Sequence, residues 1–152
     1  MTLLIQLTGV LTVALVVGIY WGPWIALTRS LPDLPPPVFL AVVGRLNTNL
    51  ATLMTVLVPA SLVSQGALVL VAAQSGPVPL ALSAVALALF AVTVVVTMVT
   101  EVPIVKQIVS WTAETMPEDW EDRRDRWLRF HLLRVIPGLA SLLLYVAAAI
   151  VG

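Results

Sequence analysis

The sequence contains no cysteine and only one histidine, His131, among 152 residues. Without cysteine the chain can form no disulfide, no thiolate metal site and no thiol nucleophile. With one histidine, a single copy cannot build a site of two imidazoles and one carboxylate for iron. One histidine and one carboxylate also fall short of the three protein ligands of a catalytic zinc ion. Thiol chemistry and these common metal sites are therefore excluded.

Charge is also scarce. Only 11% of the residues are charged and 60% are hydrophobic, whereas about a quarter of a soluble domain is charged. The net charge is zero, so the chain has no basic field for nucleic acid. Four apolar stretches, residues 3–27, 46–73, 80–100 and 127–151, reach the roughly 20 residues that a membrane span needs. We therefore predict one all-α domain over residues 1–152, an integral membrane four-helix bundle with up-down topology.

Proline and glycine mark the connections between the spans. Prolines 35–37 in "TRSLPDLPPPVF" cannot continue a helix, and they predict a short extended loop. The segment "QSGPVP", residues 74–79, predicts the turn between spans two and three. We expect Pro59 to kink span two and Pro103 to bend or break the helix after span three.

Most of the charge lies in one segment, residues 101–126, before span four. Thr115 and Glu118 have the spacing of a capping box, which predicts a cytoplasmic amphipathic helix leading into that span. Three acid–arginine pairs have the i,i+4 spacing of helix ion pairs: Asp119–Arg123, Asp122–Arg126 and Asp125–Arg129. We therefore expect a solvated helix that feeds directly into span four.

The basic residues indicate an orientation in the membrane. All eight lie in loop one, in loop three or at the start of span four. Because basic loops stay on the cytoplasmic side, we expect a multi-pass protein of the plasma (inner) membrane with both termini outside. Loops one and three would then be cytoplasmic. The N-terminus lacks the basic region and cleavage site of a signal peptide, so we expect it to remain as span one.

Polar side chains within the spans mark a candidate site. One face of span four carries six polar or small residues at helical spacing: Trp127, His131, Arg134, Gly138, Ser141 and Tyr145. Other candidates lie near the cytoplasmic ends of the first three spans: Tyr20, Trp24, Asn49 and Glu101. At about 1.5 Å per residue, these groups fall near one depth. They predict a polar chamber at the cytoplasmic mouth of the bundle.

Most of these residues also have a purely structural interpretation. Glu101 and Arg134 are equally compatible with a structural ion pair. His131 suits a capping or interface role, and Asn49 suits a hydrogen bond between helices. Trp24 is typical of an anchor at the headgroup level. No cofactor motif is evident; a haem or a single metal ion at His131 is the alternative, and homo-oligomers are compatible with the sequence.

Two segments resemble a known family. "VPIVKQIVSW", residues 102–111, follows span three, and "RDRWLRFHLLR", residues 124–134, opens span four. Both are similar to signature segments of the anthrone-oxygenase-like family of small four-span membrane proteins. "GIYWGPWIALTRSL" and "LNTNLATLMTVLVPASL" are similar to one bacterial branch of that family. The resemblance covers most of the chain, and the motif that opens span four is its most specific part.

The resemblance implies an oxidoreductase that needs no evident cofactor. Family members of assigned activity oxidise an anthrone to an anthraquinone: a base takes a proton and the resulting carbanion reacts with O₂. Carried over, His131 or Glu101 would be the base and Arg134 would stabilise the anion. Asn49 would orient a planar phenolic or quinone-like lipophile that enters from the bilayer.

This chain departs from the family pattern at one position, and a non-catalytic function remains the alternative. Relatives often have Asn after "VPI", whereas this chain has Val105, so a polar contact of the site is missing. Tyr20, Trp24 and Trp127 would complete the substrate-binding set. The competing hypothesis is a non-catalytic accessory or small-ligand-binding protein. Under either hypothesis the expected partners are membrane lipid and a lipophilic small molecule.

Overall fold

The chain folds into long helices, which a computed structural model describes over residues 2–152. Among these residues there is no strand. The helices are α1 (Thr2–Ala26), η1 (Thr28–Asp33), α2 (Pro36–Ala72), α3 (Pro77–Val96), η2 (Thr97–Glu101), α4 (Val102–Ile108) and α5 (Trp120–Val151). Four stretches are long and apolar enough to cross a membrane: Leu3–Asp33, Pro36–Ala72, Pro77–Ile108 and Trp120–Val151. The predicted all-α membrane bundle is therefore confirmed, and the chain is a multi-pass membrane protein.

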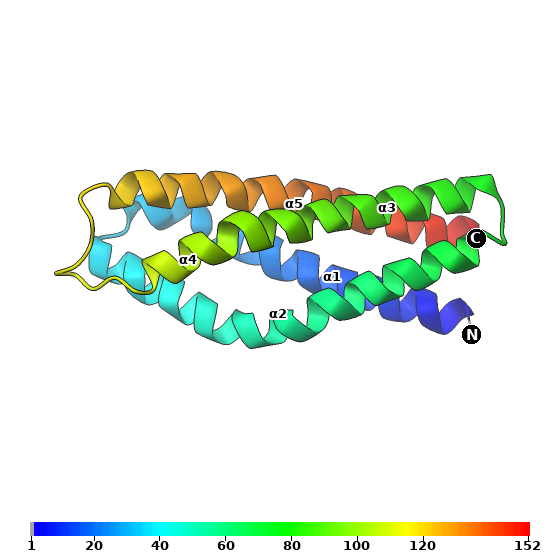
Figure 1. Ribbon diagram of the computed structural model, residues 1–152, viewed down its shortest axis with the longest axis horizontal. Coiled ribbons are helices and arrows are strands. Elements are labelled where there is room, and N and C mark those ends of the chain that lie inside the picture. The colour runs from blue at the N-terminus through cyan, green and yellow to red at the C-terminus, as the bar shows by residue number, and fades with distance from the viewer. Residues whose placement is uncertain (1) are drawn as a thin grey trace.

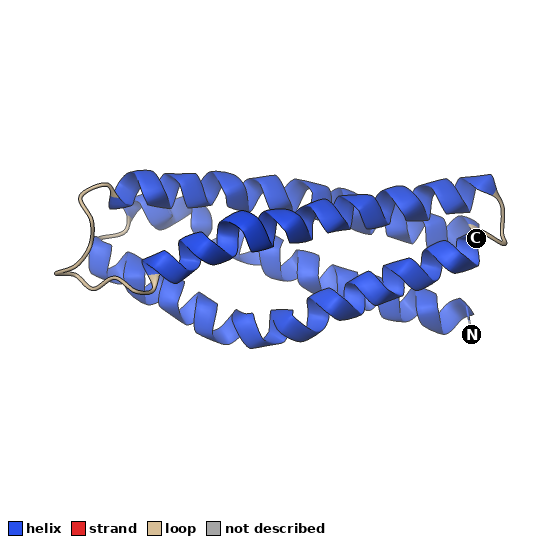
Figure 2. Ribbon diagram, in the orientation of Figure 1, coloured by secondary structure: helices blue, strands red, loops and turns tan. Residues whose placement is uncertain are grey.

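Successive spans run in opposite directions (Figure 1). Both termini and the turn between α2 and α3 lie at one end of the bundle, here called the terminal end. The link between α1 and α2 and the link between α4 and α5 lie at the other end, here called the loop end. The loops are confined to these two ends (Figure 2), as expected for antiparallel neighbours joined by short connections.

The link between α1 and α2 is more helical than the sequence predicts. Residues Thr28–Asp33 form the 3₁₀ helix η1, and α2 begins at Pro36 with Pro35 as its N-cap. The predicted extended loop over the three prolines is therefore wrong. Proline cannot continue a helix, but it suits the first turn, where its missing N–H would have no helical partner.

The helix after span three does not break at Pro103. It passes through the π-helical turn η2 into α4, and the N–H of Val102 bonds to the carbonyl of Thr97. Pro103 lies in the first turn of α4, directly after this wide turn. Single π turns of this kind are frequent at functional sites. Here the π turn carries Glu101, which is buried.

The charged helix begins later than predicted. The hydroxyl of Thr115 accepts a hydrogen bond from the N–H of Thr112, at 2.8 Å, within the loop of residues 109–119. Helix α5 starts only at Trp120, and its N-cap Asp119 makes no side-chain capping bond. The predicted capping box of Thr115 and Glu118 is therefore wrong, because the threonine hydroxyl is used inside the loop.

Only one of the three predicted helix ion pairs forms. Asp119 and Arg123 pair at 2.9 Å on the exposed surface. The other two pairs are replaced by different contacts: Asp125 with Arg124 at 2.9 Å, and Arg126 over the ring of Phe130. An arginine that lies on an aromatic ring keeps its stem on an apolar surface, which suits the membrane interface.

Small side chains allow α3 and α5 to pack closely. Ser83 and Ala86 of α3 and Gly138 and Ser141 of α5 are all buried. The hydroxyl of Ser141 donates to the carbonyl of Ala86 at 2.7 Å. Close packing of small residues and hydrogen bonds between helices are what hold helices together in a bilayer. The polar face predicted on span four is thus turned into the bundle.

The first half of helix α2 keeps its polar side chains, the predicted site residue Asn49 among them, outside the bundle. The polar or proline positions Arg45, Asn49, Thr52 and Pro59 are exposed. No residue of α2 between Val43 and Ser61 is buried, and the helix bends away from its neighbours around its middle (Figure 1). Pro59 lies within this stretch, and proline is a common cause of such a bend.

Gly9 permits a close contact between α1 and α5. A Cβ at this position would overlap the phenol of Tyr145, whose hydroxyl donates to the carbonyl of Ile5 at 3.2 Å. We expect Gly9→Ala to lower the free energy of unfolding by about 1–3 kcal/mol, because the fully buried Tyr145 must move. Thermal unfolding in detergent measures this loss. The matched control is Gly18→Ala, which meets no neighbour and should melt at or slightly above the wild-type temperature. Equal melting of both variants would contradict the close contact.

Candidate functional site

Glu101 is the centre of a buried polar cluster toward the loop end of the bundle. Its side chain is 2% exposed. Its Oε2 accepts a hydrogen bond from Trp127 Nε1–H at 2.8 Å and lies 3.1 Å from Arg134 Nη2. Both donors come from α5, across the bundle from η2. The structure therefore contains the predicted pairing of Arg134 with Glu101.

His131 uses both of its ring nitrogens in this cluster. Nε2 lies 3.0 Å from the carbonyl oxygen of Tyr20, and Nδ1 lies 2.8 Å from Arg134 Nη2. A carbonyl can only accept and a guanidinium can only donate, so Nε2 carries the hydrogen and Nδ1 accepts. Glu101 Oε2 is 3.7 Å from Nδ1, which is too long for a hydrogen bond. The contacts thus assign a neutral imidazole that positions Arg134.

The guanidinium group of Arg134 has partners at Nη1, at Nη2 and on one face, and only Nε has none within residues 2–152. Nη2 contacts Glu101 and His131, as above, and Nη1 lies 3.5 Å from the hydroxyl of Thr97. The group lies 4.1 Å from the centroid of the Tyr20 ring, in the geometry of a cation–π contact. Its side chain is 11% exposed. Several partners are what a buried ion pair needs to offset the loss of water around its charges.

Two buried polar atoms in the cluster have no partner. They are Glu101 Oε1, which can only accept while the carboxylate is ionised, and Arg134 Nε, which can only donate. A buried group without a partner costs about 1–3 kcal/mol, and more when it is charged. Such a group in a native structure calls for an explanation, such as a water, an ion or a catalytic role. The cluster thus offers one acceptor and one donor to a ligand.

Two backbone carbonyls that anchor the cluster lie three residues before a proline. Pro23 and Pro137 lie inside α1 and α5, where a proline removes one helical hydrogen bond and loosens the turn before it. The carbonyl of Tyr20, in the turn before Pro23, accepts from His131. The carbonyl of Arg134, in the turn before Pro137, accepts from the hydroxyl of Thr93 at 3.1 Å. In membrane bundles, side chains of neighbouring helices commonly bond to the backbone near a proline.

The structure does not bring all predicted site residues together. Asn49 is exposed on α2 and has no hydrogen bond to the cluster, so the expected orienting amide is not there. Trp24 is half-buried; its ring stacks on Trp21 at 5.1 Å between centroids, and Arg29 lies over it. That arrangement matches the alternative interpretation of Trp24 as a membrane anchor. The predicted chamber is thus reduced to the contact between α1, α3, η2 and α5.

Tyr20 and Trp127 do join the cluster, but through contacts that the sequence did not predict. Tyr20 contributes its backbone carbonyl and its ring face, and Trp127 contributes its indole N–H to Glu101. Val105 is half-buried among the apolar residues around Trp127. An amide at that position in relatives would therefore lie close to the indole that holds Glu101.

The cluster does not fit a metal ion or a haem iron. The two His131 nitrogens face a carbonyl and a guanidinium, so neither has a free lone pair for a metal. Glu101 Oε1 is the one free carboxylate oxygen, and a single oxygen beside an arginine is a poor cation site. Within residues 2–152 no group of three potential ligands comes together. The alternative of a haem or a single metal ion at His131 stays a prediction.

Comparison with known proteins gives one match. A family model described as anthrone oxygenase matches residues 37–150, a segment that includes Glu101, Trp127, His131 and Arg134. No curated protein and no solved structure matches the chain. Since the family model covers most of the chain, this protein belongs to the anthrone oxygenase family.

Proposed function

We propose that the protein is a membrane oxidoreductase that uses Glu101 as a general base on a planar phenolic or quinone-like lipophile. The observation that carries this proposal is the pair of unpartnered buried atoms, Glu101 Oε1 and Arg134 Nε. The carboxylate oxygen can accept a proton from the substrate. The guanidinium N–H can donate to the oxygen on which negative charge develops. Family membership supplies the reaction type, and the free atoms supply the residues.

The contacts favour Glu101 over His131 as the base, a choice that the sequence left open. His131 has no free lone pair, because Arg134 donates to its Nδ1. A base needs a free lone pair within reach of the proton, and in this cluster only Glu101 has one. We therefore assign His131 as a positioning residue that holds Arg134. Trp127 donates to the other oxygen of Glu101, Oε2, and so leaves Oε1 without a partner in the described part of the chain.

The proposed reaction needs no reactant besides O₂. Glu101 removes a proton from an activated CH₂ group, and the resulting carbanion transfers electrons to O₂. The second C–H bond then breaks, one oxygen atom becomes the new carbonyl and the other leaves as water. The overall balance is CH₂ + O₂ → C=O + H₂O. Arg134 lowers the barrier because its charge offsets the negative charge that develops on the substrate oxygen.

Helix α2 offers the route by which such a lipophile reaches the cluster. It contributes no polar contact to the cluster, and its middle part contains no buried residue. A displacement of α2 would therefore expose the cluster toward the bilayer without breaking the contacts among α1, η2 and α5. Lipophilic substrates concentrate in the bilayer, so a lateral entrance suits this substrate class.

Replacement of the base tests this proposal. We expect Glu101→Gln to lower the rate of O₂ uptake with anthrone-like substrates by roughly 100- to 10,000-fold, the usual contribution of a general base. The amide keeps the shape and can still accept from Trp127, so substrate binding should be largely retained. The measurement is O₂ consumption by the purified protein in bilayers. The matched control is Glu118→Gln, the same change at an exposed acid outside the cluster. Unchanged O₂ uptake by Glu101→Gln would contradict the assignment.

A second candidate function is a non-catalytic ligand-binding or accessory protein. The observation that favours it is that the polar atoms of the cluster bond to other groups of the chain. Of these atoms, only Glu101 Oε1 and Arg134 Nε lack such a partner among the described residues. Glu101→Gln and Arg134→Leu would lower stability under either function, by about 3–5 kcal/mol for a broken buried pair. Under the non-catalytic function, O₂ uptake would be absent from wild type as well. Wild-type turnover therefore separates the two functions.

We also propose that the protein lies in the plasma (inner) membrane with its loop end in the cytoplasm. All eight basic residues lie toward the loop end, and the terminal end has none. Basic residues remain on the cytoplasmic side during insertion. The polar cluster would then lie near the cytoplasmic face, within reach of water that can take up the released proton.

The absence of native cysteine makes this orientation directly measurable. Ser110→Cys places one thiol at the loop end, and Ser75→Cys places one at the terminal end; both positions are exposed. We expect a membrane-impermeant maleimide to label Ser75→Cys in intact cells and Ser110→Cys only after permeabilisation. The cysteine-free wild type is the background control. Labelling of Ser110→Cys alone in intact cells would reverse the orientation.

A further inference from the structure

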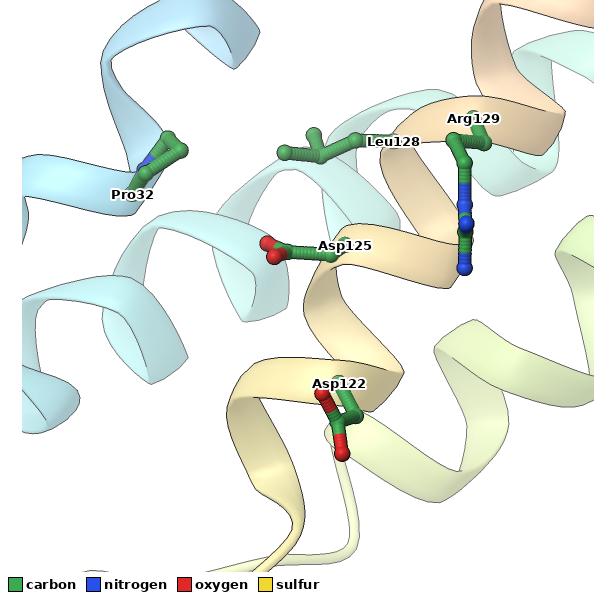
Figure 3. Close-up of a pocket in the computed structure, with 5 residues that line it drawn as sticks. All are labelled: Pro32, Asp122, Asp125, Leu128 and Arg129. Atoms are coloured by element: carbon green, nitrogen blue, oxygen red, sulfur yellow. The ribbon is translucent and has the colours of Figure 1, made fainter.

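Outside the polar cluster, a hollow of about 590 Å³ lies at the loop end between η1 and α5. Its lining residues are Pro32, Asp122, Asp125, Leu128 and Arg129 (Figure 3). Asp122 and Arg129 have no ion-pair partner in the described part of the chain, although acids and arginines alternate along this stretch of α5. Asp125 gives one oxygen, Oδ1, to Arg124. The hollow therefore combines an unpaired cation with carboxylate oxygens that are still free.

The charges around the hollow are ordered along the bundle axis. At 1.5 Å per residue, Arg129 lies about 33 Å along α5 from Val151, just beyond a hydrocarbon core about 30 Å thick. The headgroup layers that bring a bilayer to about 40–45 Å add only about 5–8 Å on each side of the core. Asp125, at about 39 Å, and Asp122, at about 44 Å, therefore lie just beyond this layer, on its water side. The cation is thus at the inner edge of the headgroup layer, and the acids are one and two turns further out.

This order matches one class of lipid headgroup. We propose that the hollow binds a zwitterionic aminophospholipid of the phosphatidylethanolamine class. Its phosphate, which is nearer the acyl chains, contacts Arg129, and its terminal ammonium contacts Asp125 and Asp122. Leu128 and Pro32 provide apolar walls for the part of the lipid next to the phosphate. The two-carbon link between phosphate and ammonium spans about one helical turn, the axial offset between Arg129 and Asp125.

The charge pattern distinguishes this headgroup from the two common alternatives. An anionic glycerol headgroup has no ammonium, so it would face two carboxylates without compensation. A choline headgroup is positively charged but has no N–H group, so it cannot form the charge-assisted hydrogen bonds that a primary ammonium makes with carboxylates. The inference does not depend on the proposed oxidoreductase activity, because none of these residues belongs to the Glu101 cluster.

Native mass spectrometry of the full-length protein tests the proposal. The protein is released from bilayers that contain equal amounts of phosphatidylethanolamine, phosphatidylcholine and phosphatidylglycerol with identical acyl chains. We expect wild type to retain phosphatidylethanolamine over either rival by roughly fivefold, the ratio that one added charge contact at a membrane surface supplies. Asp122→Asn should reduce that ratio to about one. Arg129→Gln should lower the retention of all three lipids, because all three carry the phosphate that Arg129 contacts.

Two neighbouring variants serve as controls for fold and for general charge. Glu121→Gln and Arg126→Gln make the same changes at exposed positions of α5 outside the hollow, and they should keep the wild-type preference. Equal retention of all three lipids by wild type would overturn the proposal. So would a preference for phosphatidylglycerol, a control that loses preference as much as Asp122→Asn, or a control that loses total lipid retention as much as Arg129→Gln.

Discussion

The rest of this structure depends on one buried charge, the carboxylate of Glu101. A carboxylate away from water is stable only when cations and hydrogen-bond donors surround it, because its desolvation costs several kcal/mol. Here Arg134 and Trp127 occupy one of its oxygens, and His131 orients Arg134. These donors all lie on α5, so the carboxylate fixes both the rotation of α5 and its height against η2. The same contacts bring α1 to the cluster, through the carbonyl of Tyr20.

Irregular turns within the helices place the polar groups of this cluster. The π turn η2 carries Glu101, while the helix continues through Pro103 into α4. Pro23 and Pro137 loosen the turns whose carbonyls accept from His131 and Thr93. In a membrane such carbonyls need partners inside the protein. The polar cluster and the proline-containing turns are therefore joined by hydrogen bonds between helices.

The sequence predicted the parts of the structure that follow from composition and helical period. Four spans, their up-down order and the polar face of α5 are consequences of apolar length and spacing, and Glu101 was the one acid within reach of Arg134. Asn49 was misplaced because periodicity finds a polar face without saying whether lipid headgroups or other helices cover it. The carbonyl of Tyr20 and the π turn escaped notice because they are backbone features. Pro23 was the available signal for the first, since it marks the turn of α1 that contains Tyr20.

The helices around the cluster differ in the kind of contact that they make with it, and this difference affects how a ligand could reach the buried atoms. Helices α1, α3 and α5, together with η2, hold the polar contacts, and breaking any of these contacts leaves a buried charge without its partner. Helix α2 touches the cluster only by apolar packing of Phe39 and Val43 near Trp127. Apolar packing against a bilayer-facing helix is readily exchanged for lipid, whose tails are as apolar as the side chains. The polar contact of α2 with α5, between Gln65 and Ser141 at 3.3 Å, lies away from the cluster. A displacement of the part of α2 that carries Phe39 and Val43 would therefore break none of the hydrogen bonds that hold Glu101 and Arg134.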